Sequence, residues 1–477
     1  MRTILFSTAC IAAIALHAQD TCSCSLNLER FIGKVERNYA GFRDKVTKET
    51  RARYLVLTDS LRAVAASTTD TSLCFGVLET YRAFFLDKHL QLQGTHMVSL
   101  GTGTGTEPLK TKLLSARIDS IFADPKHIWH PWEGIWQMDA YEVGVLYMEG
   151  YDELWGMIRR SDNPNWQEGM VKFRCYAPAE GRTPLRYWFG DLRMKEVSAE
   201  LIGHHLIMDG IGIWRRRGPG AIPVEDERAF ELEHGPEVQW RMLDDSTLYI
   251  KLGSCRLENK AVLDSLVAAN MEALDRIPNW IVDFRGNGGG STDVFKGLLP
   301  YLYTKPMKYY GASHWMSPEN TALLKAWCAQ NRSMLDKRTA RLIDAWVRHG
   351  EKHPNTWLKD PGGTERHGRG KSMPHRIAIL ADQGTASSGE SFLEVARGTS
   401  DKSVIFGENT GGYKDYGDLQ NHHLGCDGLV AGIPTSRMNR IDHGIRYDLV
   451  GIAPDVRIDA GERDWIAIVR KYWAQPR

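Results

Sequence analysis

The sequence has almost no net charge. Its 477 residues include 60 Lys and Arg against 59 Asp and Glu, which gives a formal net charge of +1. A protein that binds nucleic acid or an anionic membrane surface through electrostatics needs an excess of basic residues, so this balance supports neither class of partner. Hydrophobic residues make up 42% of the chain. This length and composition accommodate two to four folded domains of about 100–200 residues each.

Long apolar runs are missing beyond the N-terminus. The run from Ile4 to Leu16 follows Met1-Arg2 and precedes His17-Ala18-Gln19. It is shorter than the about 20 residues that a membrane-spanning helix needs. A basic start, an apolar stretch and a small residue in this order are typical of a secretory signal peptide. We therefore expect a signal peptide over residues 1–18, an exported protein in the periplasm or outside the cell, and no stable membrane insertion.

Cysteine is sparse. Of the eight cysteines, Cys10 lies in the expected signal peptide and seven remain. An oxidising compartment permits disulfides, and an odd number leaves at least one thiol unpaired. Cys22 and Cys24 are too close for an easy bridge to each other, so we expect them to join this end of the chain to another part.

Recognisable cofactor motifs are also missing. The glycines of the segment 101–106 lack the spacing and the strand–turn–helix context of a dinucleotide-binding loop. His204 and His205 are adjacent, and neighbouring residues on a strand point to opposite faces, which disfavours a shared metal ion. The pair His422-His423 is isolated. The sequence therefore predicts neither a metal nor a nucleotide cofactor.

Two apolar strands each end in a turn of small residues. The strand at 376–382 leads through Gly384 and Ser387 into a helical pattern, and the strand at 281–284 leads into the glycines of 286–290. Short apolar runs bounded by turns indicate interior strands of an α/β sheet. Ser387 then stands at a helix start, where free N–H groups and the helix dipole stabilise a developing oxyanion. The alternative is that Ser387 is only a helix cap, with Glu390 completing a capping box.

These motifs resemble those of the tail-specific or C-terminal-processing serine peptidases, a family that includes the tricorn core. The matching segments are Asp283-Phe-Arg-Gly-Asn-Gly-Gly-Gly290, Ala386-Ser-Ser-Gly-Glu390, Gly407-Glu-Asn-Thr-Gly-Gly412, Phe85-Leu-Asp-Lys-His89 and Gly451-Ile-Ala-Pro-Asp455. The resemblance implies a mixed α/β fold with a crotonase- or ClpP-like peptidase core. It also implies a serine-type peptidase that acts on a protein or peptide substrate.

The family's Ser-x-x-Glu spacing makes Ser387 the expected nucleophile. The backbone N–H of Ser388, together with one from Gly288 or Gly289, would then form the oxyanion hole. Loss of one such donor typically raises the barrier by about 2.7–4 kcal/mol.

The general base is where the sequence departs from the tail-specific branch. That branch has a Lys where this sequence has Tyr413, and Lys414 comes one residue late. A slip of one residue in a glycine turn could still bring its amine to Ser387, so Lys414 is the second candidate for the base. The tricorn-type branch uses His, which implies His89 as the base, and an acidic residue before the last motif, which implies Asp448. Asp442 is the second choice for the acidic residue. Asp455 is expected to be structural.

The domain organisation follows from changes of pattern. Helical spacing indicates an N-terminal helical domain over 19–110, and period-two alternation of Trp, Tyr and Val indicates an antiparallel β-rich module over 111–220. Relatives carry a PDZ domain here, but no PDZ-like signature is present, so we expect this module to replace it. The catalytic core follows over 221–477.

Within the core we expect helices over about 259–276 and 293–303 and a helical insertion over 317–350. The insertion is either a lid over the site or a buttress, and the sequence leaves both open.

The resemblance favours an exported serine endopeptidase that cuts unfolded or C-terminal protein segments. Because the family lysine is missing, a catalytically silent relative that binds peptides is the alternative. A crotonase-like acyl-CoA enzyme would have a similar core, but export disfavours it because acyl-CoA is intracellular. The sequence gives no physiological substrate and no oligomeric state.

Overall fold

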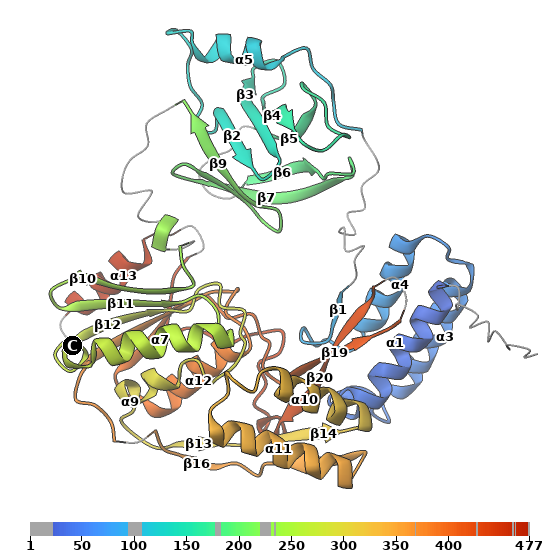
Figure 1. The fold of residues 1–477 in the computed structure, drawn as a ribbon, viewed down its shortest axis with the longest axis vertical. Helices are drawn as coiled ribbons and strands as arrows, with labels where there is room; N and C mark the ends of the chain where they lie inside the picture. The colour runs from blue at the N-terminus through green and yellow to red at the C-terminus, as the bar shows by residue number, and fades with distance from the viewer. Residues whose placement is uncertain are drawn as a thin grey trace, which may run out of the picture.

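The structure is a computed structural model that describes residues 22–93, 107–176, 183–219, 230–232, 235–367, 369–425, 428–459, 462 and 464–475. Figure 1 shows a group of N-terminal helices, a β-barrel and a larger α/β part. The expected signal peptide over 1–18 lies outside the described residues. No helix within the described ranges is long and apolar enough to cross a membrane.

Helices with one apolar face form the N-terminal part. They are α1 (Cys24–Asn38), α2 (Phe42–Lys45), α3 (Arg51–Ser67) and α4 (Thr71–Ala83). Buried Phe31, Leu61 and Tyr81 join them in one hydrophobic core. A disulfide links Cys24 to Cys74 in α4. Cys24 therefore connects this end of the chain to another helix, as its spacing from Cys22 led us to expect.

The next part is a closed antiparallel barrel of eight strands. They are β2 (Gly134–Met138), β3 (Tyr141–Met148), β4 (Glu153–Ser161), β5 (Val171–Tyr176), β6 (Thr183–Trp188), β7 (Met194–Ile202), β8 (His205–Met208) and β9 (Gly212–Gly218). Helix α5 (Ser115–Phe122) lies at the end of the barrel far from the core (Figure 1). Buried Trp136, Phe173 and Trp214 belong to the barrel's hydrophobic core, as expected for eight strands, which leave an interior that side chains can fill.

The main sheet of the α/β part positions the glycine turn after residue 283 and the turn that carries Ser387. Its order is β10 (Val238–Asp244), β11 (Thr247–Leu252), β12 (Asn279–Asp283), β17 (Arg376–Ala381), β18 (Ser403–Gly407) and β21 (Val456–Arg457). All neighbours after β10 are parallel. Residues on one face of these strands pack with helices α7 (Leu257–Ala269), α8 (Met271–Leu274) and α12 (Ser388–Thr399). Residues on the other face pack with α13 (Trp465–Ala474).

A second sheet joins the two ends of the chain. Its path is β1 (Gln91–Gln93), β20 (Val430–Met438), β14 (Ala312–Met316) and β15 (Thr356–Lys359), and β19 (Tyr416–His423) also pairs with β20. The short strands β13 (Met307–Tyr309) and β16 (Gly363–Glu365) form a separate pair, and a 3-10 helix covers Asn439–His443.

The helical insertion consists of α10 (Pro318–Gln330) and α11 (Lys337–Lys352). Its first residues are tied to α1, because the Ser317 hydroxyl donates to Asn38 Oδ1 at 2.6 Å and the Asn320 amide donates to the Asn38 carbonyl at 2.9 Å. Helix α10 also contacts β14 and β19, and α11 contacts β15. These contacts favour a buttress and not a lid over the site, the two roles considered for the insertion.

Two helices differ from expectation. Residues 293–303 form a 3-10 helix (Lys296–Leu298) and the short α9 (Leu299–Leu302) instead of one helix. Pro300 stands in the first turn of α9, where its missing N–H is tolerated, whereas inside a longer helix its ring would collide with the preceding turn. The helix expected over 259–276 is interrupted at Asn270, whose φ of −117° and ψ of 15° are not helical.

One lysine is completely buried in the barrel. Lys172 in β5 has 0% of its surface exposed, and its Nζ has no hydrogen-bond partner among the described residues. This atom lies 3.9 Å from the ring centroid of Tyr141, 4.1 Å from that of Trp166 and 5.0 Å from that of Tyr187. Burial lowers the pKa of Lys172 to about 7 because desolvation penalises the ammonium, and the charge of Asp191 acts in the opposite direction.

This lysine makes the stability of the barrel depend on pH. In the unfolded chain Lys172 keeps its proton up to its ordinary pKa of 10.5, whereas in the folded barrel it loses the proton near pH 7. The unfolded state therefore binds more protons between these values, and the free energy of unfolding rises with pH across this window. We expect the stability of the wild type relative to Lys172→Met, measured by thermal unfolding at pH 7 and 9.5, to increase at the higher pH. Lys126→Met, at an exposed position, serves as the control. If the stability difference between the wild type and Lys172→Met is the same at both pH values, Lys172 does not have the lowered pKa.

Candidate active site

Ser387 occupies a strained position between β17 and α12. Its backbone has φ +54° and ψ −114°, a combination that residues other than glycine rarely adopt. Strain of this kind is kept only where the surrounding structure enforces it, and it concentrates at functional sites. The residue is half-buried and stands directly before the first residue of α12. Its hydroxyl is therefore presented at a helix N-terminus, as predicted from the sequence.

The glycine turn after β12 lies against the turn that carries Ser387. Because β12 and β17 are parallel neighbours, their carboxyl ends meet at one edge of the sheet. The N–H of Ala386 donates to the carbonyl of Asn287 at 2.8 Å, and the Ser388 hydroxyl donates to the carbonyl of Gly290 at 2.6 Å. Ser388 is thus bound structurally, which leaves Ser387 as the candidate nucleophile.

Gly289 fits this contact but cannot serve as an oxyanion donor in this arrangement. A Cβ at Gly289 would lie 2.7 Å from the Cβ of Ser387, so the close approach requires glycine. Its N–H already donates to Asn287 Oδ1 at 2.9 Å. The N–H groups of Gly288 and Ser388 have no acceptor among the described residues. Of the three donors named from the sequence, Gly288 and Ser388 are therefore free, whereas Gly289 is occupied.

The Glu390 carboxylate holds the nucleophile turn to the turn that follows β18. It is fully buried and accepts four hydrogen bonds. The N–H groups of Ser387 and Tyr413 donate to Oε2 at 2.9 and 2.8 Å. The hydroxyl of Thr410 and the N–H of Gly412 donate to Oε1 at 2.6 and 2.9 Å. Glu390 therefore does more than cap α12, since it also fixes the 410–413 turn beside Ser387.

His89 reaches the same region from the N-terminal part. Asp87 accepts the backbone N–H of His89 at 2.8 Å and the Tyr39 hydroxyl at 2.7 Å, which fixes the chain at this position. The His89 ring is buried and lies edge-on to the Tyr413 ring, with 5.4 Å between the centroids. Its Nδ1 has no hydrogen-bond partner among the described residues.

The surroundings of His89 favour the neutral imidazole. Burial lowers its pKa most, and the positive charge of Lys414 lowers it further. Asp87, the backbone carbonyl of Tyr416 and the Glu390 carboxylate act in the opposite direction without reversing the shift. A neutral imidazole is the form that can accept a proton. Glu390 both bonds the Ser387 N–H and acts electrostatically on His89, so the fold brings the two residues to one region, although no hydrogen bond is recorded between their side chains.

Asp448 lies in the loop after the 3-10 helix Asn439–His443 and bonds the two residues that precede β19. Its Oδ1 accepts the N–H groups of Lys414 and Asp415 at 3.0 and 2.8 Å, whereas its buried Oδ2 has no partner among the described residues. Burial raises the pKa of Asp448 to about 7, with further contributions from the charges of Asp87 and Asp415. The Oδ2 atom of Asp448 can therefore accept a hydrogen bond, and the effect of the Asp87 charge on Asp448 places this atom near the segment that carries His89.

The other two acidic candidates are engaged elsewhere. Exposed Asp442 pairs with Arg437 at 2.6 Å. Asp455 accepts the Ile405 N–H at 2.8 Å and the Arg397 guanidinium at 2.6 Å, which fits the structural role expected for it.

Lys414 is paired with a carboxylate of α12. Its Nζ lies 3.2 Å from a carboxylate oxygen of Glu394, and only 11% of its side chain is exposed. Glu394 is seven residues after Ser387, about two turns further along α12. The fold thus places the ammonium where it can influence His89 electrostatically, and this ion pair disfavours Lys414 as the base.

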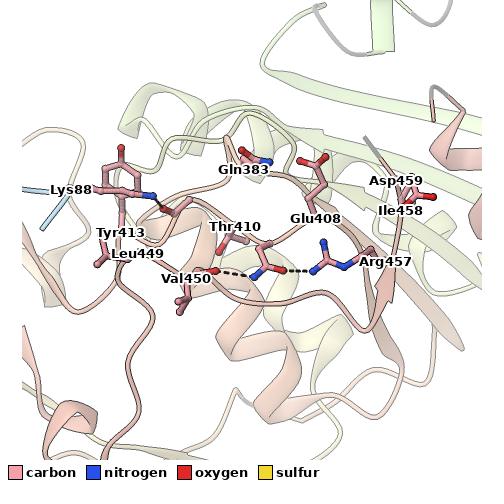
Figure 2. Close-up of a pocket in the computed structure, with 12 residues that line it drawn as sticks. Lys88, Gln383, Glu408, Thr410, Tyr413, Leu449, Val450, Arg457, Ile458 and Asp459 are labelled. Atoms are coloured by element: carbon pink, nitrogen blue, oxygen red, sulfur yellow. Dashed lines mark hydrogen bonds between the residues drawn. The ribbon is translucent and has the colours of Figure 1, made fainter. Parts of the chain in front are cut away.

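A pocket of about 500 Å³ lies next to these turns (Figure 2). Gln383, from the turn that carries Ser387, lines it together with Lys88, the residue before His89, and Tyr413, whose ring contacts His89. Leu449 and Val450 add exposed apolar surface. No group of three or more His, Cys, Asp or Glu side chains that could hold a metal occurs in the described ranges.

Comparisons with known proteins find one family match and several solved structures with a similar fold. Residues 246–458 match the model of peptidase family S41. Among solved structures, mature CPAF has a TM-score of 0.50 at 12% identity, with 94% of this chain and 96% of that chain covered. The photosystem II D1 C-terminal processing protease has a TM-score of 0.38 at 12% identity, with 94% and 97% covered. A putative peptidase from Parabacteroides merdae has a TM-score of 0.43 at 13% identity, with 95% and 98% covered.

No curated protein matches the sequence. The family match spans both glycine turns, Glu390 and the Asp448 segment, and the likeness to CPAF extends to the fold of nearly the whole chain. Residues 246–458 of this chain thus match peptidase family S41, and this match supports a serine-type peptidase.

Proposed function

We propose that this protein is an exported serine endopeptidase that hydrolyses peptide bonds in unfolded or C-terminal protein segments. The observation that carries the proposal is the position of Ser387. Its strained backbone presents the hydroxyl at the N-terminus of α12, beside a glycine turn that offers a free N–H. A hydroxyl with free backbone N–H donors nearby is suited to acyl transfer.

In the proposed reaction, the Ser387 hydroxyl oxygen attacks the carbonyl carbon of the scissile peptide and His89 takes the hydroxyl proton. The N–H groups of Ser388 and Gly288 stabilise the negative oxygen of the tetrahedral intermediate. His89 then returns the proton to the leaving amine, and an acyl-enzyme remains on Ser387. Water attacks this ester with His89 again as the base, and the acid product leaves. Ionised Asp448 would stabilise the imidazolium.

Export is supported by two features. The N-terminal sequence has the pattern of a signal peptide, and a disulfide joins Cys24 to Cys74, a bond that persists in oxidising compartments. We further propose that the core is crotonase- or ClpP-like and that the barrel takes the place of the PDZ domain carried by relatives.

The peptide-binding alternative rests on two observations. Tyr413 stands where the tail-specific branch has its lysine, and no hydrogen bond is recorded between the side chains of Ser387 and His89. Catalytic hydrogen bonds are often long before substrate binds, so this geometry alone does not exclude catalysis.

Single variants separate the candidate residues. We expect Ser387→Ala to reduce cleavage of an unfolded protein by at least about 10³-fold, because it removes the nucleophile. His89→Ala should lose roughly 10²–10⁴-fold, the usual contribution of a positioned base. Lys414→Met should lose less than about 10-fold, because its ammonium pairs with Glu394. Rates of proteolysis with purified mature protein measure all three.

Labelling with a serine-reactive phosphonate provides the control. The wild type and Lys414→Met should be labelled at Ser387, and His89→Ala should be labelled far more slowly. A wild type that neither cuts nor reacts would favour the peptide-binding alternative. A loss in Lys414→Met as large as that in His89→Ala would make lysine the base.

The pH dependence distinguishes His89 from Asp448. A base must be neutral, and because the pKa of His89 is lowered, its acid limb in kcat/KM should lie below pH 6.5. The Asp448 carboxyl, with a pKa of about 7, should add a second limb near pH 7 if its ionised form is needed. We expect Asp448→Asn to lower kcat/KM and to abolish the limb near pH 7. Persistence of that limb in the variant would assign it to another group.

Glu390 tests how the nucleophile is positioned. In Glu390→Gln an NH₂ group replaces one carboxylate oxygen and faces two donors that need an acceptor. We expect kcat to fall roughly 10–100-fold with little change in KM, because the variant disturbs Ser387 and not the substrate surface. Glu272→Gln, at an exposed position of α8, is the control for loss of a negative charge. Equal losses in both variants would indicate a general effect on the fold.

A further inference from the structure

The pocket is lined by residues that neighbour the catalytic candidates in the chain or contact them. The Gly411 N–H donates to the Thr385 carbonyl at 2.8 Å, so the pocket wall at Gly411 is joined directly to the turn that carries Ser387. Lys88 and Tyr413 line the pocket from the other side, next to His89. A peptide held at Ser387 would therefore extend into this pocket or pass its opening.

Lys88 presents an unmatched positive charge there. Its Nζ donates to the Gly411 carbonyl at 2.6 Å and lies 5.5 Å from the centroid of the Tyr413 ring. An ammonium has three donors, and this contact uses one. No carboxylate among the described residues lies within ion-pair distance of it. The half-buried ammonium thus retains donors for an incoming acceptor.

The charges along the pocket are separated. Figure 2 shows Lys88 beside Tyr413 at one end, and Glu408, Arg457 and Asp459 together at the other. A ligand carboxylate would be attracted to the Lys88 end and less favoured at the far end, where the two carboxylates outnumber the single Arg457 guanidinium. The Leu449 and Val450 side chains, 51% and 60% exposed, provide apolar surface for the rest of the ligand.

We infer that this pocket is a substrate-binding subsite in which Lys88 selects peptides that place a carboxylate beside the scissile bond. The inference deepens the proposed peptidase function and rests on it for the identity of the ligand. The carboxylate belongs either to an Asp or Glu side chain or to the C-terminus of the peptide, because both offer the same acceptor atoms. Charge-assisted hydrogen bonds are stronger and shorter than neutral ones, so such a contact can set a preference.

Binding to the full-length mature Ser387→Ala protein tests the inference without requiring catalysis. Fluorescently labelled peptides of otherwise apolar sequence are compared in matched pairs. One set replaces a single Asp by Asn at successive positions, and the other compares a free C-terminal carboxylate with a C-terminal amide. Fluorescence anisotropy gives the Kd of each peptide for Ser387→Ala alone and combined with Lys88→Met, Lys88→Arg or Lys48→Met.

We expect the carboxylate to improve Kd by about 10-fold in at least one set, a typical effect of a hydrogen bond to a charged group. Lys88→Met should reduce the ratio of the two Kd values in a pair to about 1, whereas Lys88→Arg and the exposed control Lys48→Met should retain the ratio measured for Ser387→Ala alone. The set that shows the effect identifies the source of the carboxylate. Equal binding within every pair, or a preference that survives in Lys88→Met, would overturn the inference.

Cleavage by the wild type and the Lys88-dependent preference in binding test the proposed activity and this inference separately. If the wild type cuts nothing but the Lys88-dependent preference is present, the peptidase proposal fails and the pocket assignment stands. If the wild type cuts peptides at Ser387 with no Lys88-dependent preference in kcat/KM or Kd, the pocket assignment fails and the peptidase proposal stands.

Discussion

The candidate active site depends on one buried carboxylate. Glu390 carries a negative charge that water does not reach, and burial of such a charge is tolerated only when hydrogen bonds satisfy it. Four donors do so here, and they come from two separate turns. The cost of leaving any of these donors unpaired keeps the turns together, which enforces the strained backbone at Ser387.

Contacts around this carboxylate link parts of the chain that are far apart in sequence. The 410–413 turn follows β18, and its Tyr413 ring supports His89, which comes from the end of the N-terminal helices. Strand β1, just after His89, pairs with β20 and thereby anchors that segment to the core. The insertion helices stabilise the same sheet from outside through Asn38 and β14. The N-terminal part is therefore needed for the site and is not an appendage.

Local motifs made much of this predictable from the sequence. The two strand–turn units, the order of the motifs and the antiparallel character of the β-rich module are encoded within short segments, because turns and alternation have local signatures. The Ser-x-x-Glu spacing favoured Ser387 over Ser388, whose hydroxyl donates to the Gly290 carbonyl in the structure. The roles of Asp448 and His89 are still predictions. The structure shows that Asp448 Oδ2 and His89 Nδ1 are buried without a hydrogen-bond partner among the described residues.

Other features depend on distant contacts that no local pattern contains. Glu390 appeared as a capping residue, but three of its four donors come from residues 20 or more positions away. The sequence could not distinguish Gly288 from Gly289 as oxyanion donors, whereas in the structure the Gly289 N–H donates to Asn287. Closure of the barrel and the burial of Lys172 among three rings also arise only when the strands assemble.

A crystal structure of the protein after reaction with a peptidyl phosphonate tests the central claim most directly. The account predicts a covalent bond from the Ser387 oxygen to phosphorus. One phosphonyl oxygen should accept hydrogen bonds from the N–H groups of Ser388 and Gly288, with a His89 ring nitrogen within about 3 Å of the Ser387 oxygen. An adduct whose phosphonyl oxygen lies elsewhere, or in which the Lys414 ammonium has left Glu394 to contact Ser387, would contradict it.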